Sequence, residues 1–239
     1  ASGDGSMTGG INCIAFGSNA LVWGEGNLAS GNKSFAIGEN VIASANTSVA
    51  MGYNNTASGF SSLAAGAGNT ASMSGAVALG RENTAEGQFS VAIGYQTNAG
   101  GYTATAIGNN AEATGNKSFA LGYNSIALAQ ESIAIGAGDE KLQNNIGSSL
   151  MVGFGNGLPA LFVEKGVGPD VAGFVGIGMT TPSYALDING SARAVNYITI
   201  SDRRFKKNVQ HIDNSMEIIN SLEGVRYDFR EKSHEEKSL

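Results

Sequence analysis

The sequence predicts an all-β protein, a parallel β-roll or solenoid whose rungs are 14 residues long. Three regularities of the 239-residue chain support this fold class. Glycine recurs every 14 residues over about half of the chain, alanine recurs at two fixed offsets from these glycines, and large and small side chains alternate before each glycine. Self-similarity at a fixed period is the signature of repeat architectures, whose units bury their apolar surface by stacking on their neighbours.

The glycine column runs from Gly24 to Gly136 in steps of 14 residues. Alanine stands two residues before each glycine from Gly38 onward and five residues after each glycine up to Gly122. Chance does not produce two unbroken columns, so we expect every unit to have the same local structure. The two columns are Ala36, Ala50, Ala64, Ala78, Ala92, Ala106, Ala120 and Ala134, and Ala29, Ala43, Ala57, Ala71, Ala85, Ala99, Ala113 and Ala127.

The residues before each glycine alternate between small and large, as in Ser34–Gly38, which reads SFAIG. A period of two is the signature of a strand with two different faces. We expect the large side chains to fill the interior of the coil. The face of Ser, Ala and Gly is then expected to pack against another copy of the chain, because small side chains let backbones approach closely. The alternative is a single coil whose small-residue face meets water.

A further small residue, seven positions after most of the glycines, divides the unit into two short strands, each closed by a turn. Gly and Asn tolerate the positive φ of tight turns, and asparagines gather near the expected turns at Asn54-Asn55, Asn69, Asn83 and Asn109-Asn110. Rungs about 4.8 Å apart would make eight rungs a rod of roughly 40 Å. A helix is excluded, because frequent Gly and β-branched residues are poor helix formers.

Composition excludes several classes of function. The net charge is −6 and no basic stripe is present, so nucleic acid is not an expected partner. Cys13 is the only cysteine, and His211 and His234, the only histidines, lack metal-ligand spacing. We therefore expect no disulfide, no metal and no cofactor. No apolar run approaches the ~18 residues that span a bilayer, so no membrane insertion is expected.

Residues 137–200 are expected to form a β-rich connector, whose resemblance to the connectors of phage tail fibres and bacterial surface fibres implies that it is trimeric. The stretch from Ser148 to Gly166 predicts two apolar strands around a Gly-Asn-Gly turn, and a short strand is expected at Ala185–Ile188. Gly176 and Gly178 form a G-x-G sequence, but Pro182 and a strand pattern follow instead of a helix, which argues against phosphate binding.

Charge rises abruptly from Ser201 onward, which marks a boundary of composition. Asp213 or Asn214 is expected to cap a helix that ends at Gly224, and a strand should follow. The predicted organisation is an irregular or partial repeat (1–19), the β-roll (20–136), the connector (137–200) and a short α+β segment (201–239). The chain begins in mid-pattern without an initiator Met, so we interpret it as an excised fragment.

The S-x-A-x-G unit at a 14-residue period resembles the head repeat of trimeric autotransporter adhesins of the YadA type, over residues 20–136. The resemblance implies a left-handed parallel β-roll assembled as a homotrimer and used for adhesion to host matrix, glycans or other cells. It also implies that the repeat glycines and alanines are structural, and that a ligand meets the variable, outward positions.

The stretch SDRRFKKNV, beginning at Ser201, resembles the opening of the intramolecular chaperone domain of phage endosialidase tailspikes, which trimerises its fibre and then cuts itself off. The family's pattern is Ser-Asp with a lysine five residues after the serine, here Ser201, Asp202 and Lys206. The resemblance implies that Ser201 is the nucleophile, Lys206 is its general base, and Ile200–Ser201 is the bond cut.

A lysine amine acts as a base when burial or nearby cations lower its pKa from about 10.4 toward neutrality. Arg203, Arg204 and Lys207 supply such cations. The alternative is that Ser201-Asp202 caps a short helix and the lysines are solvated. Only 39 residues follow from Ser201 to the end, so we expect this chain to stop inside the domain and self-cleavage to belong to the full-length protein.

The function expected from these features is attachment by an extracellular trimeric fibre. The fibre is anchored in a bacterial outer membrane or belongs to a phage tail, since the connector resembles those of both. Its partners are other copies of itself and a host-surface glycan or matrix protein, with no exogenous substrate. One alternative is a tailspike that degrades glycan with paired carboxylates, from among Glu25, Glu39, Glu82, Glu86, Glu112 and Glu131. The other is a structural spacer without a ligand.

Overall fold

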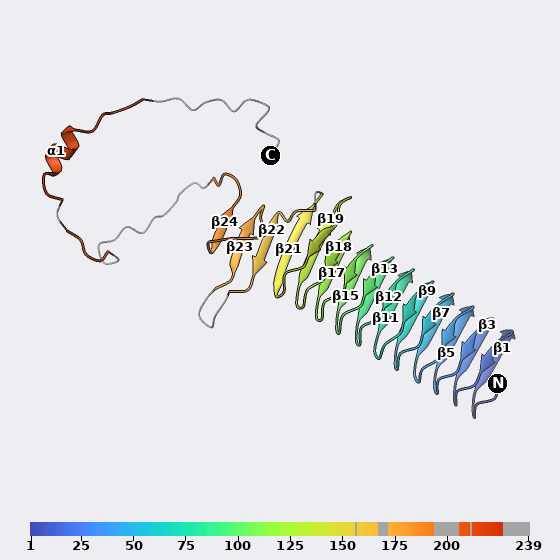
Figure 1. Cartoon of the computed structure of the whole chain (residues 1–239). Coiled ribbons are helices and arrows are strands. Elements are labelled where there is room, and N and C mark those ends of the chain that lie inside the picture. The colour runs from blue at the N-terminus through green and yellow to red at the C-terminus, as the bar shows by residue number, and fades with distance from the viewer. Residues whose placement is uncertain (156, 167–171, 194–205, 211, 227–239) are drawn as a thin grey trace. The chain divides into compact units, whose positions relative to one another are not determined.

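A computed structural model of the chain describes residues 1–155, 157–166, 172–193, 206–210 and 212–226 (Figure 1). The chain divides into two compact units, Ala1–Ala192 and Arg193–Leu239. The first unit is a parallel β-solenoid followed by a short antiparallel extension, and the second contains one short helix. This confirms the predicted fold class of stacked 14-residue rungs.

Each rung of the solenoid contains one long and one short strand, and Figure 1 shows the rungs stacked in chain order. The long strands are β1 (Met7–Ile11), β3 (Leu21–Glu25), β5 (Phe35–Glu39), β7 (Val49–Tyr53), β9 (Leu63–Ala67), β11 (Val77–Arg81), β13 (Val91–Tyr95), β15 (Thr105–Asn109), β17 (Phe119–Tyr123) and β19 (Ile133–Ala137). The short strands are β2 (Ile14–Ala15), β4 (Leu28–Ala29), β6 (Ile42–Ala43), β8 (Thr56–Ala57), β10 (Thr70–Ala71), β12 (Thr84–Ala85), β14 (Asn98–Ala99), β16 (Glu112–Ala113), β18 (Ser125–Ala127) and β20 (Leu142–Asn144).

The long and short strands form two separate parallel sheets. Residues 14 apart are partners in both of them, so Gly38 pairs with Gly52 and Ala43 with Ala57. The glycine column is needed at this spacing. Gly38 has a φ of 139°, and a Cβ there would overlap the carbonyl oxygen of Gly52 on the next rung. The left-handed sense of the coil stays a prediction.

The prediction of which strand face is inside is wrong. Both alanine columns are buried, with Ala36, Ala50 and Ala43 at 0% exposure, and they form the continuous core of the coil. The large side chains point outward: Phe35 is only half-buried and Met51 is exposed. The small-residue face therefore meets neither water nor another copy of the chain.

The physical reason is the width of the coil. Alternation of side chains shows that a strand has two faces, but it does not show which one is inside. Fourteen residues, half of them in turns and corners, enclose a space in which the two sheets meet through alanine methyl groups. Val22 and Val41, near the N-terminal end, are the only larger apolar side chains in this core cluster.

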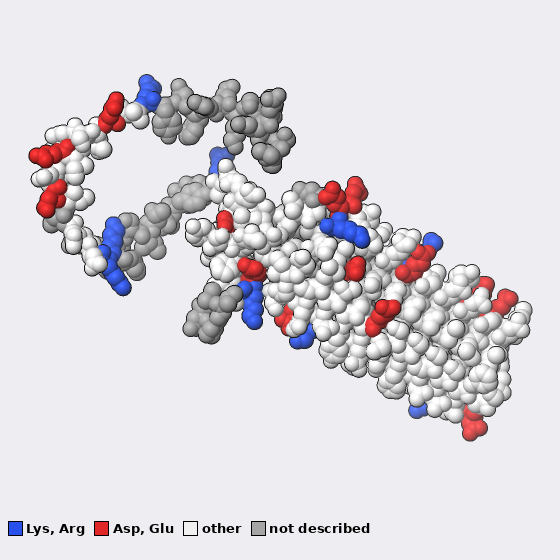
Figure 2. All heavy atoms as spheres, in the orientation of Figure 1, with Lys and Arg blue, Asp and Glu red and all other residues white. Residues whose placement is uncertain are grey.

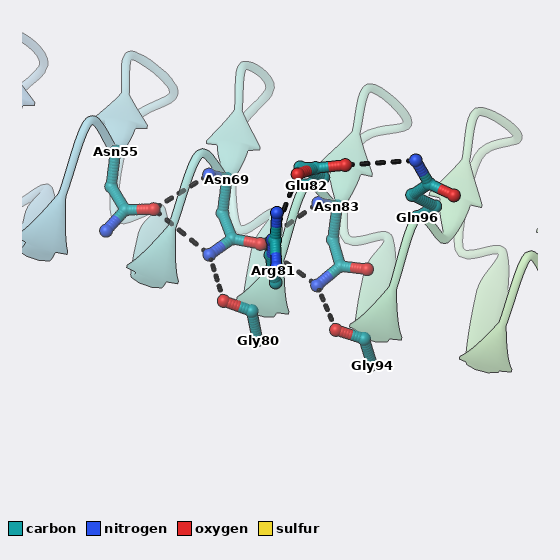
Figure 3. A network of polar contacts seen from close by, with 8 residues as sticks. All are labelled: Asn55, Asn69, Gly80, Arg81, Glu82, Asn83, Gly94 and Gln96. Atoms are coloured by element: carbon teal, nitrogen blue, oxygen red, sulfur yellow. Dashed lines mark hydrogen bonds and ion pairs between the residues drawn. The ribbon is translucent and has the colours of Figure 1, made fainter.

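Two further interior columns contain polar residues: serines are buried at most positions four residues before the glycines, and asparagines at several positions three residues after them. Asn69 donates its backbone N–H to Oδ1 of Asn55 at 2.7 Å, and its Nδ2 donates to that same oxygen at 3.0 Å and to Gly80 O at 2.7 Å. Asn83 repeats the pattern on Asn69 and Gly94, as Figure 3 shows. Each amide is satisfied by the rungs on both sides, which a buried polar side chain requires.

The asparagines thus have two different roles. Asn54 and Asn110 have the positive φ expected of turn residues, at 51° and 54°. Asn55, Asn69 and Asn83 instead lie one corner residue further on and point into the core, which corrects their prediction as turn residues.

The extension after the solenoid contains the predicted strands and one further strand, which was not predicted. β21 (Ser149–Phe154) pairs in parallel with β19 and antiparallel with β22 (Leu161–Glu164), which confirms the predicted hairpin. β23 (Phe174–Ile177) follows antiparallel, and β24 (Leu186–Ile188) pairs in parallel with β23. No helix follows Gly176 and Gly178 in the described stretch 172–193, so the G-x-G sequence has no phosphate-binding context.

The second unit contains helix α1 (Ser215–Asn220), close to the predicted position. Asn214 is its N-cap residue, but it has a left-handed backbone (φ 57°) and makes no capping side-chain hydrogen bond. The helix is followed by Ser221 as its C-cap, so the prediction that Gly224 ends it is wrong. The strand expected over Val225, Tyr227 and Phe229 lies largely outside the described residues.

Replacement of Ala92 by Leu tests the alanine interior. Ala92 lies between Ala78 and Ala106 in register, so three extra carbons have no space there, and overpacking costs about 1–3 kcal/mol. We expect a lower midpoint of thermal unfolding for Ala92→Leu. Thr84→Leu, at an outward position of the short-strand sheet and away from the large outward side chains of the long strands, is the control and should leave the midpoint nearly unchanged. The reverse ranking would contradict the assignment of faces.

Replacement of Asn69 by Ala tests the asparagine ladder. It removes the acceptor of two Asn83 N–H groups and the donor to Gly80 O, and each buried group left unpaired costs about 1–3 kcal/mol. Denaturant unfolding should show a clear loss of stability for Asn69→Ala. The exposed Asn109→Ala is the matched control; equal stabilities of the two variants would argue against the ladder.

Candidate functional site

The outer surface of the long-strand sheet is apolar along the solenoid. This apolar face consists of the residues three and one before each glycine: Leu21, Trp23, Phe35, Ile37, Val49, Met51, Leu63, Ala65, Val77, Leu79, Val91, Ile93, Thr105, Ile107, Phe119, Leu121, Ile133 and Ile135. Every one of them is half-buried or exposed, and Trp23 is 59% exposed. Parallel register stacks them in two unbroken rows, with Phe35 opposite Val49 and Ile37 opposite Met51.

The size of the apolar face is unusual for a surface that meets water. Nine rungs at about 4.8 Å give it a length of about 40 Å. Single chains rarely expose contiguous apolar patches of more than a few hundred Å², and larger ones mark sites of association. Figure 2 shows that charged side chains are also sparse over the visible surface of the solenoid.

The outward positions of the short-strand sheet differ in character. In the middle of the solenoid they are Thr56, Thr70, Thr84, Asn98 and Glu112, all half-buried. The two sheets therefore present one apolar and one mainly polar outer surface. This asymmetry favours association through the long-strand sheet and leaves the short-strand sheet for water or a polar ligand.

A hollow of about 430 Å³ lies where three long strands end, and we call it the corner hollow. The residues that line it come in pairs from successive rungs: Tyr53 and Asn54, Ala67 and Gly68, and Arg81 and Glu82. The small middle pair leaves the gap between the longer side chains of the outer pairs.

Polar contacts hold one wall of the corner hollow in place. Arg81 Nε donates to Glu82 Oε1 at 3.0 Å, and Gln96 Nε2 donates to Glu82 Oε2 at 3.0 Å (Figure 3). The Arg81 guanidinium also lies over the Tyr95 ring, with Cζ 5.5 Å from the ring centroid. The Arg81–Glu82 pair is thus fixed by residues on its own rung and on the next.

A second polar contact joins the last 14-residue rungs to the residue before β21. Ser148 Oγ donates to Glu131 Oε2 at 2.8 Å, and Lys117 Nζ donates to Oε1 at 3.3 Å. The hydrogen bond from Ser148, followed by that from Lys117, lowers the pKa of Glu131 below its ordinary value. The carboxylate therefore stays ionised to lower pH than a free glutamate would.

The predicted self-cleavage residues are only partly described by the structure. Lys206 and Lys207 are exposed. Ser201, Asp202 and the arginines at 203 and 204 lie outside the described residues, as do both histidines. The geometry of the Ser201–Lys206 pair is thus not defined, and its catalytic role stays a prediction.

Two further features concern the predicted chemistry. Glu25 and Glu39 are partners on adjacent long strands, and both are exposed. Among the described residues, no group of three or more His, Cys, Asp and Glu side chains is placed to hold a metal ion.

Among the helices of the described residues, none has the length and apolar character needed to cross a membrane.

Sequence reasoning did not identify the apolar face as the outer one, and it did not identify the corner hollow. A signal for the hollow exists in the repeat itself. When the rungs are aligned, Ala67-Gly68 occupies two positions at which the neighbouring rungs carry Tyr53-Asn54 and Arg81-Glu82. This signal can be interpreted only when the pairing of the rungs is known, and the structure provides that pairing.

Two protein families match this chain. The family described as YadA head domain repeat matches pairs of repeats at 29–55, 43–69, 57–83, 71–97, 85–111, 99–125 and 113–138. The family described as chaperone of endosialidase matches residues 201–238. Comparison with curated proteins gives no match. Residues 29–138 thus match YadA head repeats and residues 201–238 match an endosialidase chaperone, a combination that supports an adhesin- or phage-fibre-type protein.

Proposed function

We propose that this chain, with YadA head repeats and an endosialidase chaperone segment, is part of a homotrimeric fibre that attaches to a cell or matrix surface. The observation that carries the proposal is the apolar face. It is continuous over nine rungs, it is only half-buried in the single chain, and the narrow interior has no room for its side chains.

The energetics favour association through this face. Complete burial of an aliphatic side chain contributes about 1.5–3 kcal/mol, so burying a third of one contributes roughly 0.5–1 kcal/mol. Each rung offers two such positions, and the rungs repeat them along the whole solenoid. The sum can exceed the cost of lost rotational and translational freedom, which is paid once for the entire rod.

The contact between copies must be assigned differently from the sequence prediction. The small-residue face is the core of the coil, so it cannot be the contact. The apolar face takes that role instead. The number of copies, three, comes from the resemblance to YadA heads, since an apolar sheet face requires a partner without fixing how many copies assemble.

The remaining surfaces are available for attachment. The short-strand sheet presents threonines, as at Thr70 and Thr84, and the corners carry side chains that vary from rung to rung. Such positions suit a host-surface glycan or a matrix protein. A solenoid holds them on a rigid scaffold, so binding costs little conformational entropy.

The C-terminal segment has a role in assembly. By resemblance, the full-length chaperone domain brings three chains together and then separates from the fibre by cleavage at Ile200–Ser201, with Ser201 as nucleophile and Lys206 as general base. The mature fibre would lie outside the cell, either anchored in a bacterial outer membrane or as part of a phage tail.

Light scattering of the purified chain tests the trimer. We expect a mass of about three times the 24.3 kDa of one chain. Ile93→Asp places a charge in the middle of the apolar face and should yield smaller species. Thr84→Asp, on the outer surface of the other sheet, is the matched control and should remain trimeric. A wild-type chain that stays at 24.3 kDa would refute the proposal.

Self-cleavage is tested in the full-length protein that contains the complete chaperone domain. Wild type should give two bands on a denaturing gel, while Ser201→Ala and Lys206→Ala should each give one uncut band, because nucleophile or base is missing. Ser221→Ala, beyond helix α1, is the control and should cleave normally. An uncut wild-type protein would support the alternative in which Ser201-Asp202 caps a helix.

A further inference from the structure

We propose that the corner hollow binds one neutral pyranose unit of a surface glycan through its vicinal hydroxyl groups. This inference builds on the proposed attachment function and gives it a place and a ligand class. It concerns a single site on the solenoid, formed by the ends of β7, β9 and β11.

The hollow is not a requirement of the backbone. Gly68 has a φ of 68°, but the equivalent positions are occupied by Asn54 (φ 51°) and Glu82 (φ 57°), so longer side chains are tolerated at this conformation. A Cβ at Gly68 would meet its nearest neighbour, Glu82 Cγ, at an ordinary 3.6 Å. Likewise, Ala67 stands in a column that elsewhere holds Tyr53 and Arg81. The fold therefore accepts either long or short side chains at positions 67 and 68, and the short ones present there open the hollow.

One wall offers a hydrogen-bond donor and an acceptor side by side. Arg81 uses Nε to bind Glu82 and its flat face to contact Tyr95. Within the described residues no protein partner is recorded for its two terminal nitrogens, so these remain able to donate. Glu82 is held by Arg81 and Gln96, yet each carboxylate oxygen has a further lone pair. Because these contacts already restrict the two side chains, which are 67% and 41% exposed, a ligand would have less ordering to do.

This pair is complementary to a vicinal diol. Each sugar hydroxyl can donate to the carboxylate and accept from the guanidinium, and charged partners make such hydrogen bonds strong. The Asn54 amide adds a donor and an acceptor, and the ring of Tyr53, itself 48% exposed, supplies an apolar wall for the sugar's C–H groups.

Size and charge narrow the class of ligand. The volume of about 430 Å³ lies at the lower end of small-molecule sites, which suits one sugar ring. The rungs that carry the outer pairs are two steps apart, or roughly 10 Å. Arg81 and Glu82 carry opposite charges, so the hollow has no net charge of its own to attract an anion, and the chain's net charge of −6 disfavours carboxylated or sulfated sugars. The ligand is therefore expected to be a neutral hexose.

The test fills the hollow without disturbing the fold. Ala67→Tyr introduces a residue that already occurs at the same position of other rungs, at Tyr53, Tyr95 and Tyr123. Asn109→Tyr makes the same change two rungs beyond Arg81 and is the matched control. Arg81→Ala removes the donor fork. The probes are neutral gluco-, galacto- and manno-configured oligosaccharides, with a sialylated oligosaccharide for comparison, measured against the purified chain by glycan array and by saturation-transfer NMR.

We expect at least one neutral probe to bind wild type and Asn109→Tyr equally. Ala67→Tyr and Arg81→Ala should weaken that binding about tenfold or more, as loss of a charge-assisted contact does. Unchanged binding by Ala67→Tyr, or binding of the sialylated probe alone, would overturn the proposal. So would a change of oligomeric state in Ala67→Tyr but not in Asn109→Tyr, because the hollow would then be a contact between copies.

A parallel attachment assay separates this site from the function as a whole. If wild type attaches to host cells or matrix and Ala67→Tyr attaches equally well, the site is wrong and the attachment function stands. If wild type attaches to no cell or matrix surface and binds no probe, both are wrong and the chain is a structural spacer.

Discussion

The narrow interior of the coil is the constraint on which the rest of the structure depends. Two sheets joined by tight corners meet through alanine methyl groups, and the core cluster contains almost nothing larger. Apart from a few residues such as Val22 and Val41, the bulky apolar side chains of the repeat are therefore directed outward, where they form the apolar face. A single rung buries too little surface to offset its conformational entropy, so stability must come from the stacking of many rungs.

The same constraint explains how polar groups are distributed. Space that alanine does not fill is taken mainly by serine and asparagine. The asparagine amide binds the rungs before and after it, as Asn69 binds Asn55 and Gly80. These hydrogen bonds fix the 14-residue register from inside the coil, and the side chains at the corners take no part in them. Residues at the corners can therefore vary without destabilising the core. The corner hollow is one result: the small residues Ala67 and Gly68 lie between the longer side chains of Tyr53 and Arg81.

The described part of the C-terminal unit, unlike the solenoid, has almost no buried side chains. It has one six-residue helix with no buried residue, and the lysines at 206 and 207 are exposed. Apolar residues of α1 such as Ile218 and Ile219 are exposed as well. A segment of this kind gains little by folding on itself. Residues 201–238, which include this helix, match the family described as chaperone of endosialidase.

The sequence by itself determined the strands, their 14-residue register, the β21–β22 hairpin and the approximate place of α1, because periodicity and turn residues are local signals. It could not determine which face is inside, because alternation is the same whether the alanines point inward or outward. Only the tertiary structure decided this, through the width of the closed coil. It also decided that Asn55, Asn69 and Asn83 point into the core. The corner hollow, where Ala67 and Gly68 lie between Tyr53 and Arg81, likewise exists only in the folded chain, because stacking makes residues 14 apart neighbours.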